Sequence, residues 1–408
     1  MASVRSVCQS VQQEGEPALR RFSEQFDHVV PARLRVPGEA IASALADLDP
    51  QLRAAIELAV ERRREVCRQV EAEPAWRSAE LAPGARVGQA LVPVDRVGLY
   101  VPGGLAPLAS SVLMNVVPAQ AAGVPSIAVA TPPQAEYGGL PHPTILAVCG
   151  LLGVDEVYAV GGAQAIAMFA YGVAGLCAPV DLITGPGNIY VVAAKRLVRG
   201  HVGIDSEAGP TEIAVLADES ADPALVAADL ISQAEHDPLA ASVLVTNSVE
   251  LLSGVEAHLQ RQTDALATRD RLVTALSGQQ SGAVLVDDMD QGLAVVNAYG
   301  AEHLEIQTAH PEQLARGVRN AGAIFLGPCS PVPLGDYTAG STHVLPTGGA
   351  ARYSSGLSTR SFLKAIHVID YNGEALARVG ESIQTFADAE HLPGHAAAVA
   401  VRTQGDRP

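Results

Sequence analysis

Residues 97–130 read VGLYVPGGLAPLASSVLMNVVPAQAAGVPSIAVA. Runs of β-branched and aliphatic residues at 97–101 and 126–130 favour two strands, and the segment between them favours a helix. A strand, a helix and a second strand in this order are typical of a βαβ unit, whose strands are parallel neighbours in one sheet. The stretch therefore predicts an α/β fold.

The same alternation continues towards the C-terminus. Further strand candidates, with helical segments between most of them, lie at 156–160, 180–184, 212–217, 242–246, 282–287, 303–307 and 323–327. This order predicts mainly parallel sheets. Because so many strands would overfill one small sheet, we expect two Rossmann-like domains.

Both ends of the chain are expected to be helical. Apolar positions recur at spacings of three and four through 37–71, so the first 75 residues are read as helix. The last fifty residues are predicted to return to helix. There, FLKAIHVID (362–370) leads into an amphipathic stretch that Pro393 and Gly394 interrupt.

Composition and charge narrow the class of protein. The 408 residues are 48% hydrophobic and 4% aromatic, with 38 glycines and 27 prolines, which is typical of a soluble α/β enzyme. A net charge of −17 argues against nucleic acid or an anionic membrane as a partner.

Cysteine spacing and the N-terminal sequence bear on the compartment. The five cysteines form no CxxC pair and are expected to be buried, reduced thiols. The N-terminus has no apolar core of signal-peptide length, and no apolar run reaches membrane-spanning length. We therefore expect a cytoplasmic protein.

Five polar clusters in the C-terminal half suggest chemistry. They are Gln233 with His236, Glu302 with His303, Asp336, His343, and Glu390 with His395. Such nitrogen and oxygen donors can hold zinc and still leave a histidine–carboxylate pair for proton transfer. Any one of these histidines alone would be read as an ordinary core or surface residue, so the hypothesis depends on the clusters occurring together.

Spacing within two of the clusters has geometric consequences. Gln233 and His236 are three residues apart, so a helix places both on one face. Glu390 and His395 would lie about 140° apart on an unbroken helix, so they can face one substrate only if the helix is interrupted between them.

Three glycine-rich turns follow strand candidates. They are Pro102-Gly103-Gly104, Gly161-Gly162-Ala163-Gln164 and Gly185-Pro186-Gly187-Asn188. Glycine lets the backbone approach a ligand, and in open parallel sheets ligands lie beyond the carboxyl ends of strands. None is a GxGxxG motif followed by an acidic residue, so ordinary βα turns and a nucleotide crevice both remain open.

Longer strings along nearly the whole chain resemble one family. GPGNIYVVAAKRLVRGHVGID (185–205), AGPTEIAVLAD (208–218), LISQAEHDP (230–238), GDYTAGSTHVLPTGGAAR (335–352) and HLPGHAAAV (391–399) are similar to histidinol dehydrogenase sequences. The resemblance implies oxidation of L-histidinol to L-histidine through L-histidinal, with two NAD and one zinc ion per subunit. This reaction is the last step of histidine biosynthesis. Members of the family are homodimers whose active sites draw residues from both subunits.

The resemblance also assigns roles to residues of this chain. It implies His303 as general base and Glu302 as the group that activates water, with zinc held by Gln233, His236, Asp336 and His395. The implied NAD contacts are Tyr100, Gln164 and Asn188, and the implied substrate contacts are Thr211, Gln233, His236, His303, Asp336, His343, Glu390 and His395. The segment carrying Glu390 and His395 would enter the partner subunit's active site.

A domain division follows from pattern and resemblance together. We expect an N-terminal helical segment and the start of the first α/β domain at 1–99, and the NAD-side Rossmann-like domain at 100–210. A second Rossmann-like domain with the metal and catalytic residues is expected at 211–357, and a helical dimerisation segment at 358–408.

The chain departs from the family pattern in a few places. Thr211 stands where serine is usual, Thr342 stands where asparagine is usual, and the sequence begins some tens of residues late. The two threonines leave room for a related dehydrogenase of another small amino or sulfonated alcohol. A non-catalytic binding or assembly protein is disfavoured, because every proposed acid, base and ligand is present.

Overall fold

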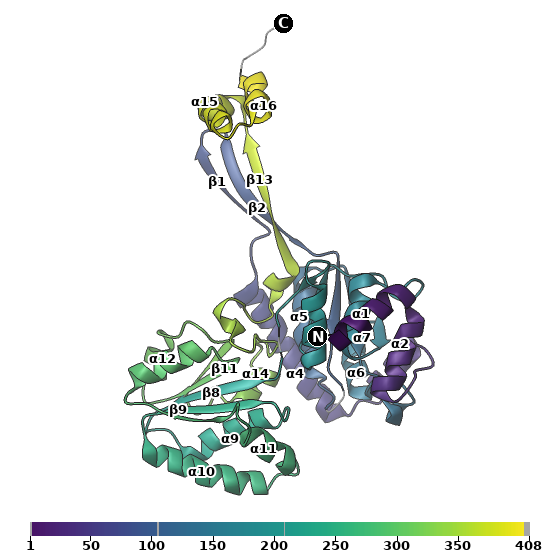
Figure 1. Cartoon of the computed structure of the whole chain (residues 1–408), viewed down its shortest axis with the longest axis vertical. Coiled ribbons are helices and arrows are strands. Elements are labelled where there is room, and N and C mark those ends of the chain that lie inside the picture. Colours follow the sequence, from purple (N-terminus) through teal and green to yellow (C-terminus); the bar gives the residue numbers. More distant parts are fainter. Residues whose placement is uncertain (1, 104–105, 208, 404–408) are drawn as a thin grey trace. The chain divides into compact units, whose positions relative to one another are not determined.

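The computed structural model describes residues 2–103, 106–207 and 209–403. Gly104 of the first glycine-rich turn, and Ala208 at the start of AGPTEIAVLAD, lie outside these ranges. The chain forms two compact units (Figure 1). The main unit comprises Met1–Glu71 and Val94–Phe362, and the small unit comprises Ala72–Pro93 and Leu363–Pro408.

Helices fill the N-terminal part of the main unit. They are α1 (Ala2–Glu14), α2 (Glu16–Phe22), η1 (Ser23–Asp27), α3 (Gly38–Ala46), α4 (Pro50–Val66) and η2 (Cys67–Glu71). Helix α4 begins with Pro50 in its first turn, and the Asp49 carboxylate caps it by accepting from the Gln51 and Leu52 amides. The predicted helical character is confirmed for most of residues 2–71, but residues 28–37 form no helix and Arg35 makes an isolated β-bridge with Tyr158.

The first sheet is entirely parallel, in the order β5-β4-β3-β6-β7. Its strands are β3 (Arg96–Tyr100), β4 (Ser126–Thr131), β5 (Val157–Ala159), β6 (Leu182–Thr184) and β7 (Gly203–Ile204). The connecting helices are α5 (Ser110–Ala122), η3 (Ala135–Tyr137), α6 (Pro143–Leu151), α7 (Gly162–Tyr171) and α8 (Ile189–Val198).

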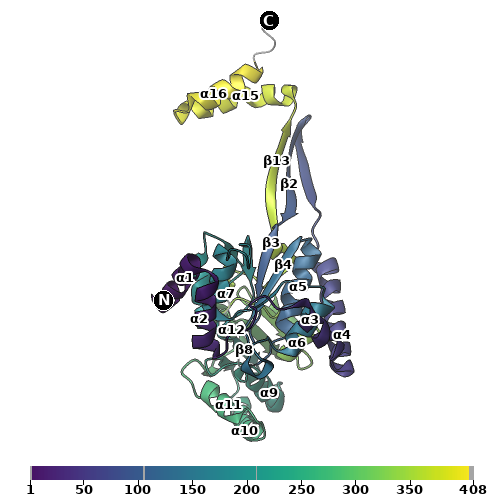
Figure 2. The ribbon, with the colours of Figure 1, turned by 90° about the vertical axis from the view of Figure 1, so that its right-hand side faces the viewer.

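Alternate residues of these strands enter two separate cores. Val97 and Leu99 pack in a cluster with residues of α3, α4, α5 and α6, whereas Tyr100 packs with residues of α1, α2, α7 and α8. Both faces of the sheet are therefore covered, as a doubly wound fold requires (Figure 2).

The second sheet repeats the plan, in the order β10-β9-β8-β11-β12, again all parallel. Its strands are β8 (Glu212–Ala217), β9 (Ala241–Thr246), β10 (Gly282–Leu285), β11 (His303–Gln307) and β12 (Ala323–Leu326). Its helices are α9 (Pro223–Ala234), α10 (Val249–Asp264), α11 (Arg269–Leu276), α12 (Met289–Tyr299), α13 (Pro311–Ala315) and α14 (Val332–Tyr337). Two short turns of helix follow, η4 (Ala350–Arg352) and η5 (Thr359–Phe362). Every strand candidate contains a strand, which confirms the α/β class with two Rossmann-like halves.

The small unit is an antiparallel sheet followed by two helices. Strands β1 (Trp76–Ala82), β2 (Ala85–Pro93) and β13 (Leu363–Tyr371) lie in the order β1-β2-β13, and α15 (Gly373–Ala389) and α16 (Pro393–Thr403) follow. The helical prediction for 362–370 is wrong from Leu363 onward. The β-branched residues of this segment instead pair with β2, from Leu363 opposite Pro93 to Tyr371 opposite Ala85.

The predicted interruption near Pro393 is confirmed. Helix α15 ends at Ala389, His391 has a left-handed φ of 57°, and α16 begins at Pro393. Four cysteines are buried free thiols as expected, whereas Cys329 is exposed. In the part of the chain that the structure describes, no helix has the length and apolar character needed to cross a membrane.

Candidate active site

The Glu302–His303 pair lies where strand β11 begins. Its neighbour β8 runs parallel to it, with His303 opposite Ile213, so Thr211 and Glu212 lie at the same amino edge of the sheet. Helix α9 returns towards this edge and carries Gln233 near its C-terminus, with His236 just beyond it. The catalytic candidates therefore gather at the amino ends of strands, not at the carboxyl ends where open α/β sheets usually bind ligands.

Glu302 is held at one carboxylate oxygen. Its Oε2 accepts hydrogen bonds from the Thr211 hydroxyl and, at 3.0 Å, from the Glu212 amide. Only 5% of the residue is exposed, and this burial raises the pKa of Glu302 well above its ordinary value despite those two donors. A raised pKa makes the ionised carboxylate a stronger base.

His303 is a neutral imidazole with an assignable tautomer. Its Nδ1 lies 3.2 Å from the Glu212 carbonyl oxygen and 3.5 Å from Glu302 Oε2. A carbonyl oxygen can only accept, so Nδ1 carries the proton and Nε2 keeps its lone pair. Burial lowers the pKa of His303 to about 3, so the ring stays uncharged at neutral pH.

Gln233 presents an unsatisfied acceptor. Its Nε2 donates to the Thr211 hydroxyl oxygen, and its Oε1 is buried with no hydrogen-bond partner. Leaving a buried acceptor unpaired costs about 1–3 kcal/mol, so such an atom in a polar cluster points to a ligand. The orientation of the Gln233 amide follows from Thr211.

His236 and Asp336 complete the donor set of the main unit. Their Nε2 and Oδ2 atoms are 3.9 Å apart. Burial raises the pKa of Asp336 to about 6, although the charge of His236 opposes this shift. Within the described ranges, no three His, Cys, Asp or Glu side chains gather as a metal cluster. The amide oxygen of Gln233 together with His236 and Asp336 nevertheless suits zinc, which accepts nitrogen and oxygen ligands.

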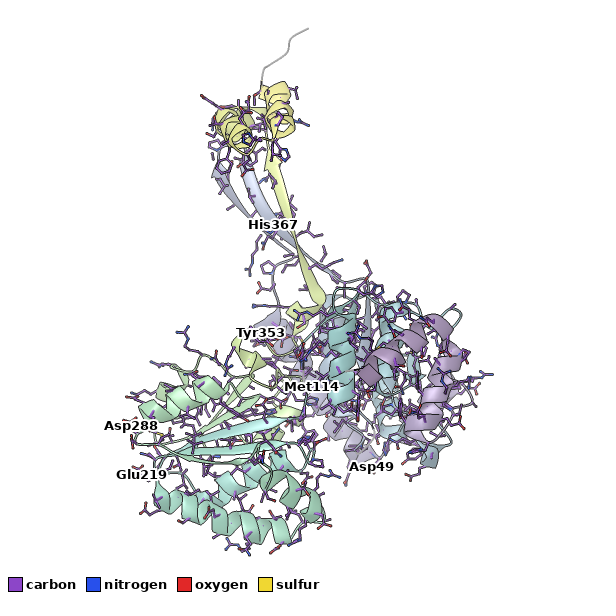
Figure 3. The ribbon with its side chains drawn as sticks, in the orientation of Figure 1. Asp49, Met114, Glu219, Asp288, Tyr353 and His367 are labelled. Carbon is purple, nitrogen blue, oxygen red and sulfur yellow. The ribbon has the colours of Figure 1, made fainter. Side chains whose placement is uncertain are left out.

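His343 joins the two halves of the main unit. Its Nδ1 lies 3.1 Å from the Asp336 carbonyl oxygen, so Nδ1 is protonated and Nε2 accepts from the Ser111 hydroxyl at 3.2 Å. Ser111 is fully buried near the start of α5, one turn before Met114, which Figure 3 labels. Burial lowers the pKa of His343 to about 4. His343 therefore links helix α14, which carries Asp336, to Ser111 of α5 in the first half.

Sequence reasoning missed two residues of this cluster, Ser111 and Glu212. Glu212 supplies the amide that binds Glu302 and the carbonyl that orients His303, while its own carboxylate accepts from the Gly348 amide. Burial raises the pKa of Glu212. The only feature of the sequence that pointed to Glu212 was its position directly after Thr211. Contacts made by backbone atoms do not depend on residue type, so they cannot be read from the sequence.

Thr342, the second departure from the family pattern, makes a local contact. Its hydroxyl accepts from the Val344 amide at 3.1 Å, two residues along the chain. The hydroxyl of Thr211, by contrast, joins Gln233 to Glu302.

Comparison with known proteins gives the family. The family model described as histidinol dehydrogenase matches residues 1–403. The chain belongs to the histidinol dehydrogenase family. It is therefore an oxidoreductase that acts on a small-molecule substrate, and the family name associates it with histidine biosynthesis.

Individual relatives agree with this assignment. Histidinol dehydrogenase from Cutibacterium acnes is 64% identical over 98% of this chain and 93% of its own length, and the one from Thermobifida fusca is 63% identical over 98% and 90%. The crystal structure of histidinol dehydrogenase from Elizabethkingia anophelis matches with a TM-score of 0.93 at 34% identity, covering 99% of this chain and 92% of that one. An acetylating aldehyde dehydrogenase from Geobacillus thermoglucosidasius, at 13% identity and a TM-score of 0.51, shares the fold alone.

The three residues predicted to contact NAD lie in the first half. Tyr100 ends β3, and its hydroxyl accepts from the Gly162 amide at 3.0 Å; burial raises the pKa of Tyr100 to about 12. Gln164 is buried in the first turn of α7, and Asn188 caps α8 by accepting from the Tyr190 and Val191 amides. All three lie at or just beyond the carboxyl ends of parallel strands.

Glu390 and His395 belong to the small unit. Glu390 is the C-cap residue directly after α15, His395 lies in the first turn of α16, and both are exposed. The chain turns between them at His391, so the two side chains need not follow the geometry of one regular helix.

Proposed function

We propose that the chain catalyses the zinc-dependent, four-electron oxidation of L-histidinol to L-histidine through L-histidinal with two NAD, the last step of histidine biosynthesis. One observation carries this proposal. A hydrogen-bonded line runs from Gln233 through Thr211 to Glu302, beside the neutral imidazole of His303. It joins a candidate metal ligand, whose oxygen is free, to a candidate acid–base pair.

The donor set supports zinc as the resident metal. Gln233, His236 and Asp336, with His395 of the partner subunit, would hold the ion. When bound there, zinc would act as a Lewis acid that anchors nitrogen atoms of the substrate.

The protein's own groups then divide the proton transfers. His303 accepts the hydroxyl proton through Nε2 while hydride leaves for NAD, and its neutral state at physiological pH suits this role. The intermediate aldehyde must gain water before the second oxidation. Glu302 takes a proton from that water, and its raised pKa strengthens the carboxylate as a base. Thr211, Asp336, His343 and Glu390 would orient the substrate.

The cofactor side of the proposal depends on the first half. Tyr100 and Asn188 follow the neighbouring strands β3 and β6, and Gln164 follows β5 of the same parallel sheet. The Gly162 amide, two residues before Gln164, donates to the Tyr100 hydroxyl, so the three residues can contact one dinucleotide. On this basis residues 100–210 form the NAD-side domain, and residues 211–357 form the metal and catalytic domain.

Exposed apolar side chains support a homodimer. Ile369, Phe386 and Val401 of the small unit are 73%, 70% and 73% exposed, which is unusual for large apolar groups. Burial against a second copy would cover them and would bring Glu390 and His395 to the partner's site. We propose residues 358–408 as the dimerisation segment of a cytoplasmic enzyme.

Absorbance of NADH tests the function directly. With L-histidinol and NAD, the purified chain should form NADH, and a zinc chelator should abolish the signal until zinc is restored. NADH formed only from another small amino or sulfonated alcohol would favour the related dehydrogenase. Zinc bound without NADH from any of these alcohols would indicate a non-catalytic protein.

A further inference from the structure

Lys195 is an unusual residue for this chain. Of the 27 basic residues only Lys195 and Lys364 are lysines, and Lys195 is buried on α8 with 1% of its side chain exposed. It forms an ion pair with Asp205, whose side chain is 4% exposed. The proton transfers proposed above use neither group.

This ion pair binds both backbone polar groups of Gly185, and so holds the two peptide groups on either side of its Cα in the third glycine-rich turn. The Gly185 amide donates to Asp205 Oδ2 at 2.8 Å, and the Gly185 carbonyl accepts from Lys195 Nζ at 3.0 Å. Rotation of either peptide group about the Gly185 Cα would therefore break a hydrogen bond to a buried charged group.

Gly185 itself leaves little freedom at this point. Its φ is +111°, and an added Cβ would lie 2.1 Å from the Tyr100 carbonyl oxygen. The turn after β6 is thus pressed against the end of β3, where Tyr100 lies. Asn188, three residues further on, caps α8. The ion pair consequently fixes a turn that lies between two of the proposed cofactor contacts.

Stability alone does not account for a buried ion pair. Replacing such a pair with apolar residues of similar volume is often neutral or stabilising, because desolvation offsets the attraction. What the charges add here is a fixed orientation of the two peptide groups that flank the Gly185 Cα. A chain that uses arginine almost everywhere keeps lysine here, which fits the geometry. A compact ammonium can reach Gly185 and Asp205 together, whereas a planar guanidinium is bulkier.

We propose that Lys195 and Asp205 are positioning residues for the dinucleotide, holding the turn 185–188 as a preformed wall of the cofactor site. The inference rests on the NAD site of the proposed function. A preformed turn loses less conformational entropy when the cofactor binds. Loss of the ion pair should therefore lower the affinity for the cofactor.

The test measures the affinity of Lys195→Met for NADH by fluorescence titration in the absence of substrate. Losing hydrogen bonds from a charged group should weaken NADH affinity about ten- to hundredfold. Hydrogen exchange of the amides at 183–191 should become faster, and KM for NAD should change more than kcat. Zinc content should not change. Arg196→Met is the matched control, because neighbouring Arg196 forms an exposed ion pair with Glu207 and should leave NADH affinity as in wild type.

A second variant guards against misfolding. Lys195→Met with Asp205→Asn leaves no unpaired buried charge and keeps an acceptor for the Gly185 amide, so it should fold even if the single variant does not. If the wild-type protein binds NADH and a folded variant binds it with the same affinity, the positioning role is refuted. A wild-type protein that binds no NADH instead refutes the cofactor of the proposed function, and the inference with it.

Discussion

The hydroxyl of Thr211 sets the orientation of two neighbours. It donates to Glu302, so its oxygen is left to accept from Gln233 Nε2, and the amide oxygen of Gln233 is thereby turned away from Thr211. A side chain with no special chemistry thus decides which atom of Gln233 is free. The sequence could name all three residues, but it could not show that one hydroxyl joins them.

Removing the Thr211 hydroxyl should break the hydrogen bonds that connect Gln233 to Glu302. Thr211→Val keeps the shape but loses both hydrogen bonds, so we expect kcat/KM for L-histidinol to fall about ten- to hundredfold, and zinc to be held less tightly. Thr211→Ser, which restores the hydroxyl, should remain close to wild type. Steady-state kinetics and metal analysis of the two variants check this, and equal behaviour of valine and serine would contradict it.

Substitutions of His303 and Glu302 should affect different half-reactions. His303→Asn should slow alcohol oxidation by roughly 10²–10⁴, the usual effect of losing a general base. Glu302→Gln should spare that step more and impair conversion of L-histidinal to L-histidine. Single-turnover measurements started from each substrate distinguish the two roles. Equal losses in both half-reactions for Glu302→Gln would show that the division is wrong.

At the scale of elements, strand β11 supplies more than its first residue. His303, Glu305 and Gln307 alternate along β11 and so point to one face of the sheet. Gln307 donates to both Glu305 and Asp229 of α9, at 3.0 and 2.8 Å, and Glu305 accepts from the Val332 amide at the start of α14. The buried carboxyl groups of Asp229 and Glu305, joined through Gln307, therefore connect α9, β11 and α14. These elements carry Gln233, His303 and Asp336.

This pair should make stability depend on pH. Burial, and then the charge of Asp229, raise the pKa of Glu305 from 4.5 to about 9, so the folded protein keeps a proton that the unfolded chain releases. Its contribution to the free energy of unfolding is therefore largest in acid and declines as the pH rises from about 4.5 to about 9. Glu305→Gln should flatten that decline. Urea unfolding from pH 5 to 9 measures it, and parallel slopes for the two proteins would contradict the assignment.

Elements were predictable where the pattern was local. Most of the parallel strands are short apolar runs between turns, so the local pattern located them, including the exposed β10. The two-residue strand β7 was too short to leave such a pattern and was not predicted. Strand β13 was misread because its partner β2 lies far away in the sequence and most of its side chains are exposed. Without a buried face, its apolar spacing carried no information about the pairing that makes it a strand.

For the whole molecule, the small unit is the part that a single chain explains least. Among the described residues of this unit, the buried hydrophobic ones are all alanines: Ala85, Ala375 and Ala387. Larger apolar side chains, such as Phe386, remain exposed. The positions of Glu390 and His395 could be matched to a family pattern, but under the proposed homodimer what they face would be set by a second chain. No periodicity in one sequence encodes that.

Mixed dimers test the shared site. Homodimers of Glu302→Gln and of His395→Ala should both be nearly inactive, because each site lacks one group. After subunit exchange, half of the dimers are mixed, and one of their two sites receives an intact main unit and an intact His395. Activity should therefore recover to about a quarter of wild type. A mixture of Glu302→Gln with His303→Asn is the control, since both changes lie in the main unit and no intact site can form. If exchanged dimers of the first pair stay as inactive as this control, each site is built within one chain.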